Sequence, residues 1–83
     1  MKNEEIKNQI LICFQNIVIH LLEYKNEIKF SNLVNDSLTF ISLMIEIENC
    51  FQKEIPSNFM TLDAFDTLKD IFDMVCLMLD NNI

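Results

Sequence analysis

Apolar residues recur with a helical period in the first part of the chain. From Glu4 to Tyr24 they stand three or four positions apart, at Ile6, Ile10, Phe14, Ile17, Leu21 and Tyr24. Residues at this spacing lie on one face of an α-helix. The pattern therefore predicts a first helix over about residues 4–24.

A second helical pattern begins behind two residues that favour a helix start. Asp36 and Ser37 have short polar side chains, which can accept a hydrogen bond from a free N–H of the first turn. After them in the sequence, polar residues recur at Thr39, Ser42, Glu46 and Asn49 and form one stripe along the predicted helix. The remaining positions are apolar over more than half of the circumference. We predict a second helix over 37–51 with more apolar surface than one bundle face can bury.

The only proline separates the second helix from the last one. Pro56 cannot donate a backbone hydrogen bond and disfavours a helical conformation at Ile55. We expect a loop behind it, with one short helical turn at about 62–65.

A third helical pattern follows Thr67. Asp70 stands three residues later, in the position of the acidic arm of a capping box. The apolar period behind it predicts a last helix over about 67–79, and residues 80–83 are expected to fray.

Together these elements predict an all-α fold. Residues 25–35 keep no helical period, so we expect a long loop between the first two helices. The chain has no glycine and one proline, whereas turn-rich β folds need many such residues. We predict a single domain over 1–83, a small bundle of three to four helices. The residues expected to share its core are Leu33, Leu43, Ile47, Phe51, Ile71 and Val75.

Charge restricts the partners of this domain. The formal net charge is −7 and the cations are six scattered lysines, which makes nucleic acid and anionic membranes poor partners. An acidic surface suits a basic patch on a larger protein. No apolar run is long enough to span a bilayer, and no signal-peptide pattern is visible, so we expect no membrane insertion and a cytoplasmic location. We also expect a monomer.

The chain has few residues suited to catalysis or metal binding. Cys13, Cys50 and Cys76 are odd in number and match neither a disulfide framework nor a metal site, so we interpret them as reduced core residues. His20 is the only histidine, and its place beside the apolar stripe of the first helix suggests a structural role. We expect no enzyme activity and no bound metal.

An ordered set of positions runs through the second part of the chain. It comprises Asp36-Ser37-Leu38, Leu43, Glu48, Phe51, Ile55-Pro56 and Thr67-Leu68-Lys69-Asp70-Ile71. With these residues the chain resembles the acyl carrier protein family over about residues 30–75. The resemblance implies the fold of that family. It also implies that Ser37 receives 4′-phosphopantetheine from coenzyme A through a phosphopantetheinyl transferase, and that the arm holds an acyl group as a thioester.

The resemblance also implies where partner enzymes bind. Such partners load the acyl group or use it in fatty-acid, polyketide or related biosynthesis. Asp36 resembles the acidic neighbour that caps the helix and takes part in transferase recognition. We expect further contacts at the apolar Leu38 and Ile41 and at the acidic Glu46 and Glu48; Phe40 and Met44 are assigned equally to core or contact.

The chain departs from the family pattern at several positions. The residues before the motif are Leu33-Val34-Asn35 in place of glycine and a small residue, so we expect Asn35 to take a left-handed conformation. Thr39 and Ser42 replace two acidic residues that are typical of fatty-acid carriers.

Two alternatives to a fatty-acyl or polyketide carrier stay open. The stretches 47–49 and 57–67 are similar to the corresponding spans of D-alanyl carrier proteins. The first alternative is therefore an aminoacyl carrier, of the D-alanyl or peptidyl type, that is served by an adenylating ligase. The second is a helical protein-interaction module without a prosthetic group.

Overall fold

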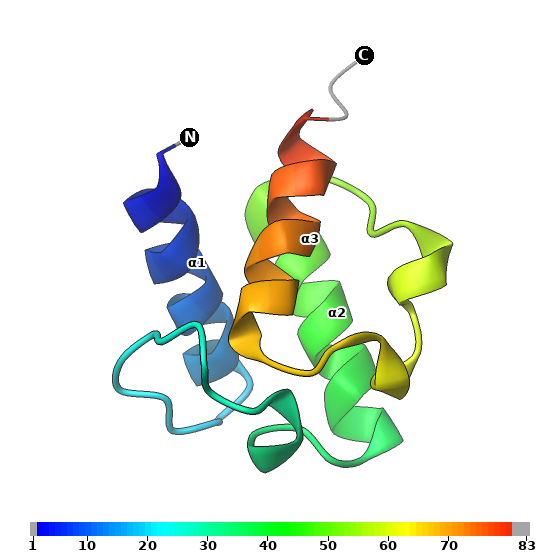
Figure 1. Ribbon diagram of the computed structural model, residues 1–83. Coiled ribbons are helices and arrows are strands. Elements are labelled where there is room, and N and C mark those ends of the chain that lie inside the picture. Colours follow the sequence, from blue (N-terminus) through cyan, green and yellow to red (C-terminus); the bar gives the residue numbers. More distant parts are fainter. Residues whose placement is uncertain (1, 81–83) are drawn as a thin grey trace.

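The computed structural model describes residues 2–80 and contains three α-helices in that range. They are α1 (Asn3–Asn16), α2 (Ser37–Phe51) and α3 (Leu68–Asp80) (Figure 1). Three single-turn 3₁₀-helices stand between them, η1 (Phe30–Asn32), η2 (Ser57–Phe59) and η3 (Leu62–Ala64). The predicted small all-α bundle is confirmed. Fraying is expected at residues 80–83, but Asp80 is the last residue of α3. Residues 81–83 lie outside the described range.

One apolar core joins the three helices. Ile10 and Phe14 of α1, Leu43 of α2, and Ile71 and Val75 of α3 are fully buried within it. Burying these side chains is the main driving force for packing the helices together.

The predicted core is confirmed at all but one position. Leu43, Ile47, Phe51, Ile71 and Val75 are buried, whereas Leu33 is only partly buried. Its neighbour Val34 takes the buried place. A loop has no helical period from which the inward-facing residue could be predicted.

The first helix is shorter than the predicted 4–24, because α1 ends at Asn16. The N–H of Val18 donates to Gln15 O over 3.0 Å and the N–H of Ile19 donates to Phe14 O over 3.0 Å. These two bonds form a Schellman motif, with Val18 in a left-handed conformation at φ 66°. The chain therefore leaves the helix axis, and His20, expected on the helix, lies exposed in the following loop.

The long loop is attached to the segment in front of α3. The N–H of Phe30 donates to Asp66 O, and the N–H of Leu68 donates to Ile28 O, each over 2.9 Å. An ion pair between Lys29 Nζ and Asp66 Oδ1, 3.1 Å apart, lies beside these bonds. Two segments that are far apart in sequence thus form a short antiparallel bridge.

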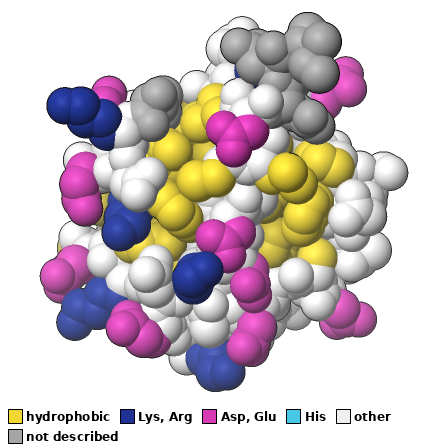
Figure 2. All heavy atoms as spheres, turned by 45° about the horizontal axis from the view of Figure 1, so that its top comes forward, with side chains coloured by type: hydrophobic (Ala, Val, Ile, Leu, Met, Phe, Trp, Pro, Cys, Tyr) yellow, Lys and Arg dark blue, Asp and Glu magenta, His cyan; other side chains and the backbone are white. Residues whose placement is uncertain are grey.

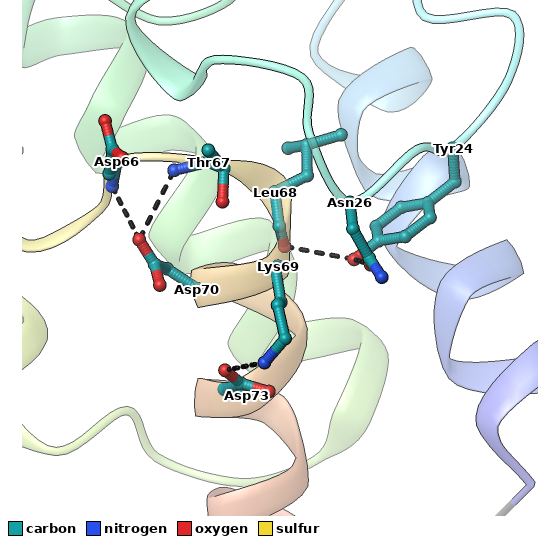
Figure 3. A network of polar contacts seen from close by, with 8 residues as sticks. All are labelled: Tyr24, Asn26, Asp66, Thr67, Leu68, Lys69, Asp70 and Asp73. Carbon is teal, nitrogen blue, oxygen red and sulfur yellow. Dashed lines mark hydrogen bonds and ion pairs between the residues drawn. The ribbon is translucent and has the colours of Figure 1, made fainter.

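Tyr24 connects the same loop to α3 (Figure 3) and, through Lys7, to α1. Its hydroxyl lies 3.1 Å from Leu68 O and 2.9 Å from Asn26 Oδ1, both of which can accept its proton. Lys7 Nζ lies 5.7 Å from the centroid of the Tyr24 ring and 5.5 Å from that of Phe72. A cation between two rings is stabilised by their electron-rich faces. Burial, with a contribution from Asp73, raises the pKa of Tyr24 to about 12.

The start of α3 confirms the predicted capping role of Asp70. Its Oδ2 accepts hydrogen bonds from the N–H groups of Asp66 over 2.7 Å and Thr67 over 3.3 Å (Figure 3). These N–H groups precede the helix and have no intrahelical partner. The helix begins at Leu68, one residue after the predicted start.

The backbone in front of α2 differs from the expectation for Asn35. Among residues 2–80, only Val18 and Gln52 have a positive φ, so Asn35 is not left-handed. Val34 N–H donates to Phe30 O over 2.9 Å, and this turn brings the chain to Asp36 without such a residue. Gln52, at φ 56°, ends α2 instead.

Candidate functional site

The candidate site is the start of α2, where Asp36 acts as the N-cap. Asp36 has an extended backbone, with φ −137° and ψ 157°, and its Oδ2 accepts the N–H of Thr39 over 3.2 Å. The hydrogen bonds with Thr39 hold the pKa of Asp36 below its usual range. An ionised carboxylate at this position satisfies a free donor and complements the helix dipole.

Ser37 is the first residue of α2 and is exposed to solvent. Asp36 before it and Leu38 behind it are exposed as well. The predicted motif therefore lies together at one accessible helix end. A modifying enzyme could reach the Ser37 hydroxyl without unfolding the domain.

A cluster of aromatic side chains packs around Phe40, in the first turn of α2. Phe30 lies at a ring-centroid distance of 6.2 Å from Phe40 and 5.2 Å from Phe65, and Phe59 lies 6.0 Å from Phe65. These rings come from η1, α2, η2 and the segment before α3. Aromatic pairs at such distances add stability beyond their buried area. Sequence reasoning missed this cluster, because its members are scattered along the chain and share no local pattern.

Three apolar side chains of α2 form an exposed stripe, which we call the α2 stripe. Leu38 is 79% exposed, Ile41 49% and Ile45 51%. They stand at i, i+3 and i+7 and thus share one side of the helix. Leu38 and Ile41 are exposed as expected, and Ile45 is an addition. Phe40 and Met44, assigned equally to core or contact, are buried and belong to the core.

The two predicted acidic contact residues have different surroundings. Glu48 lies on the side of the α2 stripe, seven residues after Ile41, and its Oε2 accepts the N–H of Ile55 over 2.9 Å. Glu46 faces α1, where its Oε2 accepts a hydrogen bond from Asn16 Nδ2 over 2.7 Å. Both carboxylates are partly buried and have partners within the chain.

A hollow opens beside the start of α2. Its volume is about 440 Å³, and Val34 and Asn35, the residues just before the motif, form part of its wall. Phe30, Leu62 and Phe65 supply an apolar lining, and Asp63 and Asp66 add two carboxylates. Asn35 and Ser37 are two residues apart, so their Cα atoms are separated by at most about 7 Å.

Acidic side chains outnumber lysines in the chain, with 13 Asp and Glu against 6 Lys. Figure 2, which looks toward the end where α1 begins and α3 finishes, shows apolar areas bordered by acidic side chains and fewer lysines.

Among residues 2–80, no group of three His, Cys, Asp or Glu side chains is arranged to hold a metal ion. None of the helices described here is both long and apolar enough to cross a membrane.

Comparisons with protein-family models, curated proteins and solved structures gave no significant match to this chain.

Proposed function

We propose that the chain is an acyl carrier protein whose Ser37 bears a 4′-phosphopantetheine arm. The observation that supports this most strongly is the position of Ser37, exposed at the first residue of a capped helix. The terminal thiol of the arm holds an acyl group as a thioester and presents it to partner enzymes. The protein itself performs no catalysis.

The start of α2 suits the chemical group that would be attached there. Transfer from coenzyme A joins the phosphate of the arm to Ser37 Oγ and releases adenosine 3′,5′-bisphosphate. The resulting phosphodiester carries a negative charge, which the free N–H groups and the positive dipole end of a helix favour.

Activation of the serine hydroxyl is left to the transferase. A serine needs an adjacent base to become a nucleophile. The only histidine, His20, lies in the loop after α1, and the Asp36 carboxylate accepts the N–H of Thr39. The phosphopantetheinyl transferase and its metal ion must therefore supply the base and the charge stabilisation.

The aromatic packing in the first turn of α2, close to Ser37, suits a carrier protein that tethers its cargo. Phe40, one turn into α2, is buried against Phe30 and Phe65. This anchor fixes the point of attachment while the arm itself moves. Tethering raises the local concentration of the cargo at each partner active site.

The α2 stripe is the partner surface in this proposal. Leu38 and Ile41 lie within one turn of Ser37, so an enzyme that holds the arm also reaches these side chains. Buried apolar anchors contribute more to an interface than exposed ion pairs do. The net charge of −7 additionally steers the chain toward basic patches on its partners.

The hollow beside the motif favours an aminoacyl cargo as the second candidate. Asp63 is exposed at this hollow, whereas Asp66 forms an ion pair with Lys29. A protonated amino group on the cargo would complement the Asp63 carboxylate. Loading by an adenylating ligase with an amino acid, but not with a fatty acid, would select this candidate.

Cellular location follows from the same proposal. A reducing compartment suits a chain whose three cysteines match no disulfide framework. We place the carrier in the cytoplasm, as a monomer, where coenzyme A and the transferase are present.

The test is a transferase reaction followed by intact-mass measurement. The chain is incubated with coenzyme A, magnesium and a broad-specificity phosphopantetheinyl transferase. One added phosphopantetheine is expected for the wild type and for Ser42→Ala, which removes another exposed serine of α2. Ser37→Ala should remain unmodified. A wild-type chain that stays bare would favour the interaction module without a prosthetic group.

A further inference from the structure

Two thiols meet at the contact between α1 and α2, away from the proposed attachment site. Cys13 lies in the last turn of α1 and is fully buried, and Cys50 lies in the last turn of α2 and is partly buried. The proposed attachment at Ser37, the first residue of α2, makes no use of them.

Glu46 holds both thiols in place. Cys13 Sγ donates to the backbone O of Glu46 over 3.9 Å, and Cys50 Sγ donates to its Oε2 over 3.7 Å. Both thiols therefore contact the same residue, and the Cys50 side chain lies close enough to contribute, after burial, to the raised pKa of the Cys13 thiol. Asn16 of α1 donates to the same carboxylate oxygen over 2.7 Å, which fixes Glu46 across the helix contact.

The two thiols differ in their access to solvent, because Cys13 is fully buried and Cys50 only partly. Burial, reinforced by the Cys50 and Glu46 side chains, raises the pKa of the Cys13 thiol well above its usual range. A neutral buried thiol is a poor first target, because the thiolate is the reactive form. Cys50 is the member of the pair that an oxidant can reach from solvent.

We propose that Cys13 and Cys50 form an intramolecular disulfide between α1 and α2 when the protein meets a low-molecular-weight disulfide such as oxidised glutathione. The Cys50 thiolate attacks one sulfur of the oxidant, and one small thiolate leaves. Cys13 then loses its proton to water, attacks Cys50 Sγ and displaces the second small thiolate. Two protein thiols become one disulfide, and the oxidant is reduced to two small thiols.

Cys76 is an internal control for this reaction. It is also partly buried, but it lies on α3, where it lines a separate surface hollow together with Ile6 and Leu79. Neither Cys13 nor Cys50 lines this second hollow. Cleavage after lysine places each cysteine in its own peptide, 8–25 for Cys13, 30–53 for Cys50 and 70–83 for Cys76. A disulfide between any two of them is therefore directly visible by mass spectrometry.

The experiment treats the folded full chain with oxidised glutathione, alkylates the remaining thiols and digests with a lysine-specific protease. We expect peptide 8–25 joined to peptide 30–53, with Cys76 mainly alkylated. The cross-linked protein should melt about 10 °C or more above the reduced one, because the bond closes the long loop from Cys13 to Cys50. Reduction should reverse both changes.

Three variants make the result decisive. Cys76→Ser should form the same disulfide, and Cys13→Ser should stop at a mixed disulfide of Cys50 with glutathione. Glu46→Gln keeps the hydrogen-bond geometry but removes the charge that disfavours the Cys13 thiolate, so cross-linking should be faster. Oxidation that leaves a lasting mixed disulfide in the wild type, or that joins Cys76 as readily, would overturn the proposal.

Discussion

The carboxylate of Asp36 accepts a hydrogen bond from the backbone N–H of Thr39 over 3.2 Å, and Ser37 lies between them at the exposed start of α2. One residue thus caps the helix and adjoins the proposed modified serine. Its two roles, capping and charge, can be separated by substitution.

Asp36→Ala should lower the free energy of unfolding by about 1 kcal/mol, as loss of an N-cap usually does. Asp36→Asn keeps an acceptor for Thr39 N–H and should stay close to the wild type in stability. If the charge serves transferase recognition, both variants should be modified more slowly. Urea denaturation and modification rates measure the two effects. Equal stability of the alanine variant and the wild type would show that the cap contributes nothing.

Val18→Gly should stabilise the protein by about 0.5–1 kcal/mol. Val18 has a φ of 66° and is 80% exposed, so its side chain is strained without contributing much packing. A left-handed conformation costs about 1–2 kcal/mol for a residue with a Cβ. Glycine removes this cost, but it also raises the conformational entropy of the unfolded chain, which offsets part of the stabilisation. Thermal unfolding measures the change. Val18→Thr, which is also β-branched, is the matched control and should bring no gain.

The stability of the fold should fall between about pH 10 and pH 12. Burial raises the pKa of Tyr24 to about 12 in the folded state, against about 10 when unfolded. Its stabilising contribution is therefore fully present below pH 10 and is lost as the pH rises through 12. Tyr24→Phe cannot ionise and should show a smaller decrease in melting temperature over this range. Identical pH profiles for the two proteins would contradict the assignment.

Substitutions in the α2 stripe should slow modification of Ser37 more than removal of acidic charge does. Leu38→Ala or Ile41→Ala should lower the transferase rate about fivefold or more, as loss of an interface anchor worth about 1 kcal/mol would. Glu48→Gln keeps an acceptor for Ile55 N–H and should have a smaller effect. Rates at low and moderate salt, with circular dichroism as a fold control, test this. Losses that are largest for Glu46→Gln and Glu48→Gln and that follow ionic strength would indicate an electrostatic interface instead.

The starts of α2 and α3 could be predicted from sequence because local chemistry determines them. Asp36 caps one helix and Asp70 the other, each through a side chain within a few residues of the donors it satisfies. The apolar periods after these caps correctly assigned Leu43, Ile47, Phe51, Ile71 and Val75 to the core, but they left Phe40 and Met44 undecided. Local signals of this kind are visible in a single sequence.

The end of α1 could not be predicted, because the local pattern continues beyond it. Ile17, Leu21 and Tyr24 keep a helical period, and no glycine or proline marks the turn at Val18. Tertiary contacts override the local preference here: Leu21 is buried in the core, and Tyr24 reaches across to Leu68 O. The contacts of Cys13 and Cys50 with Glu46 likewise depend on how α1 packs against α2.

Locating the modification within the chain tests the role of Ser37 most directly. After the transferase reaction, the lysine-specific peptide 30–53 contains Ser31, Ser37 and Ser42, and fragmentation of this peptide distinguishes the three serines. We expect a single phosphopantetheine, attached only to Ser37. Attachment to Ser31 or Ser42, or an addition that persists in Ser37→Ala, would contradict it.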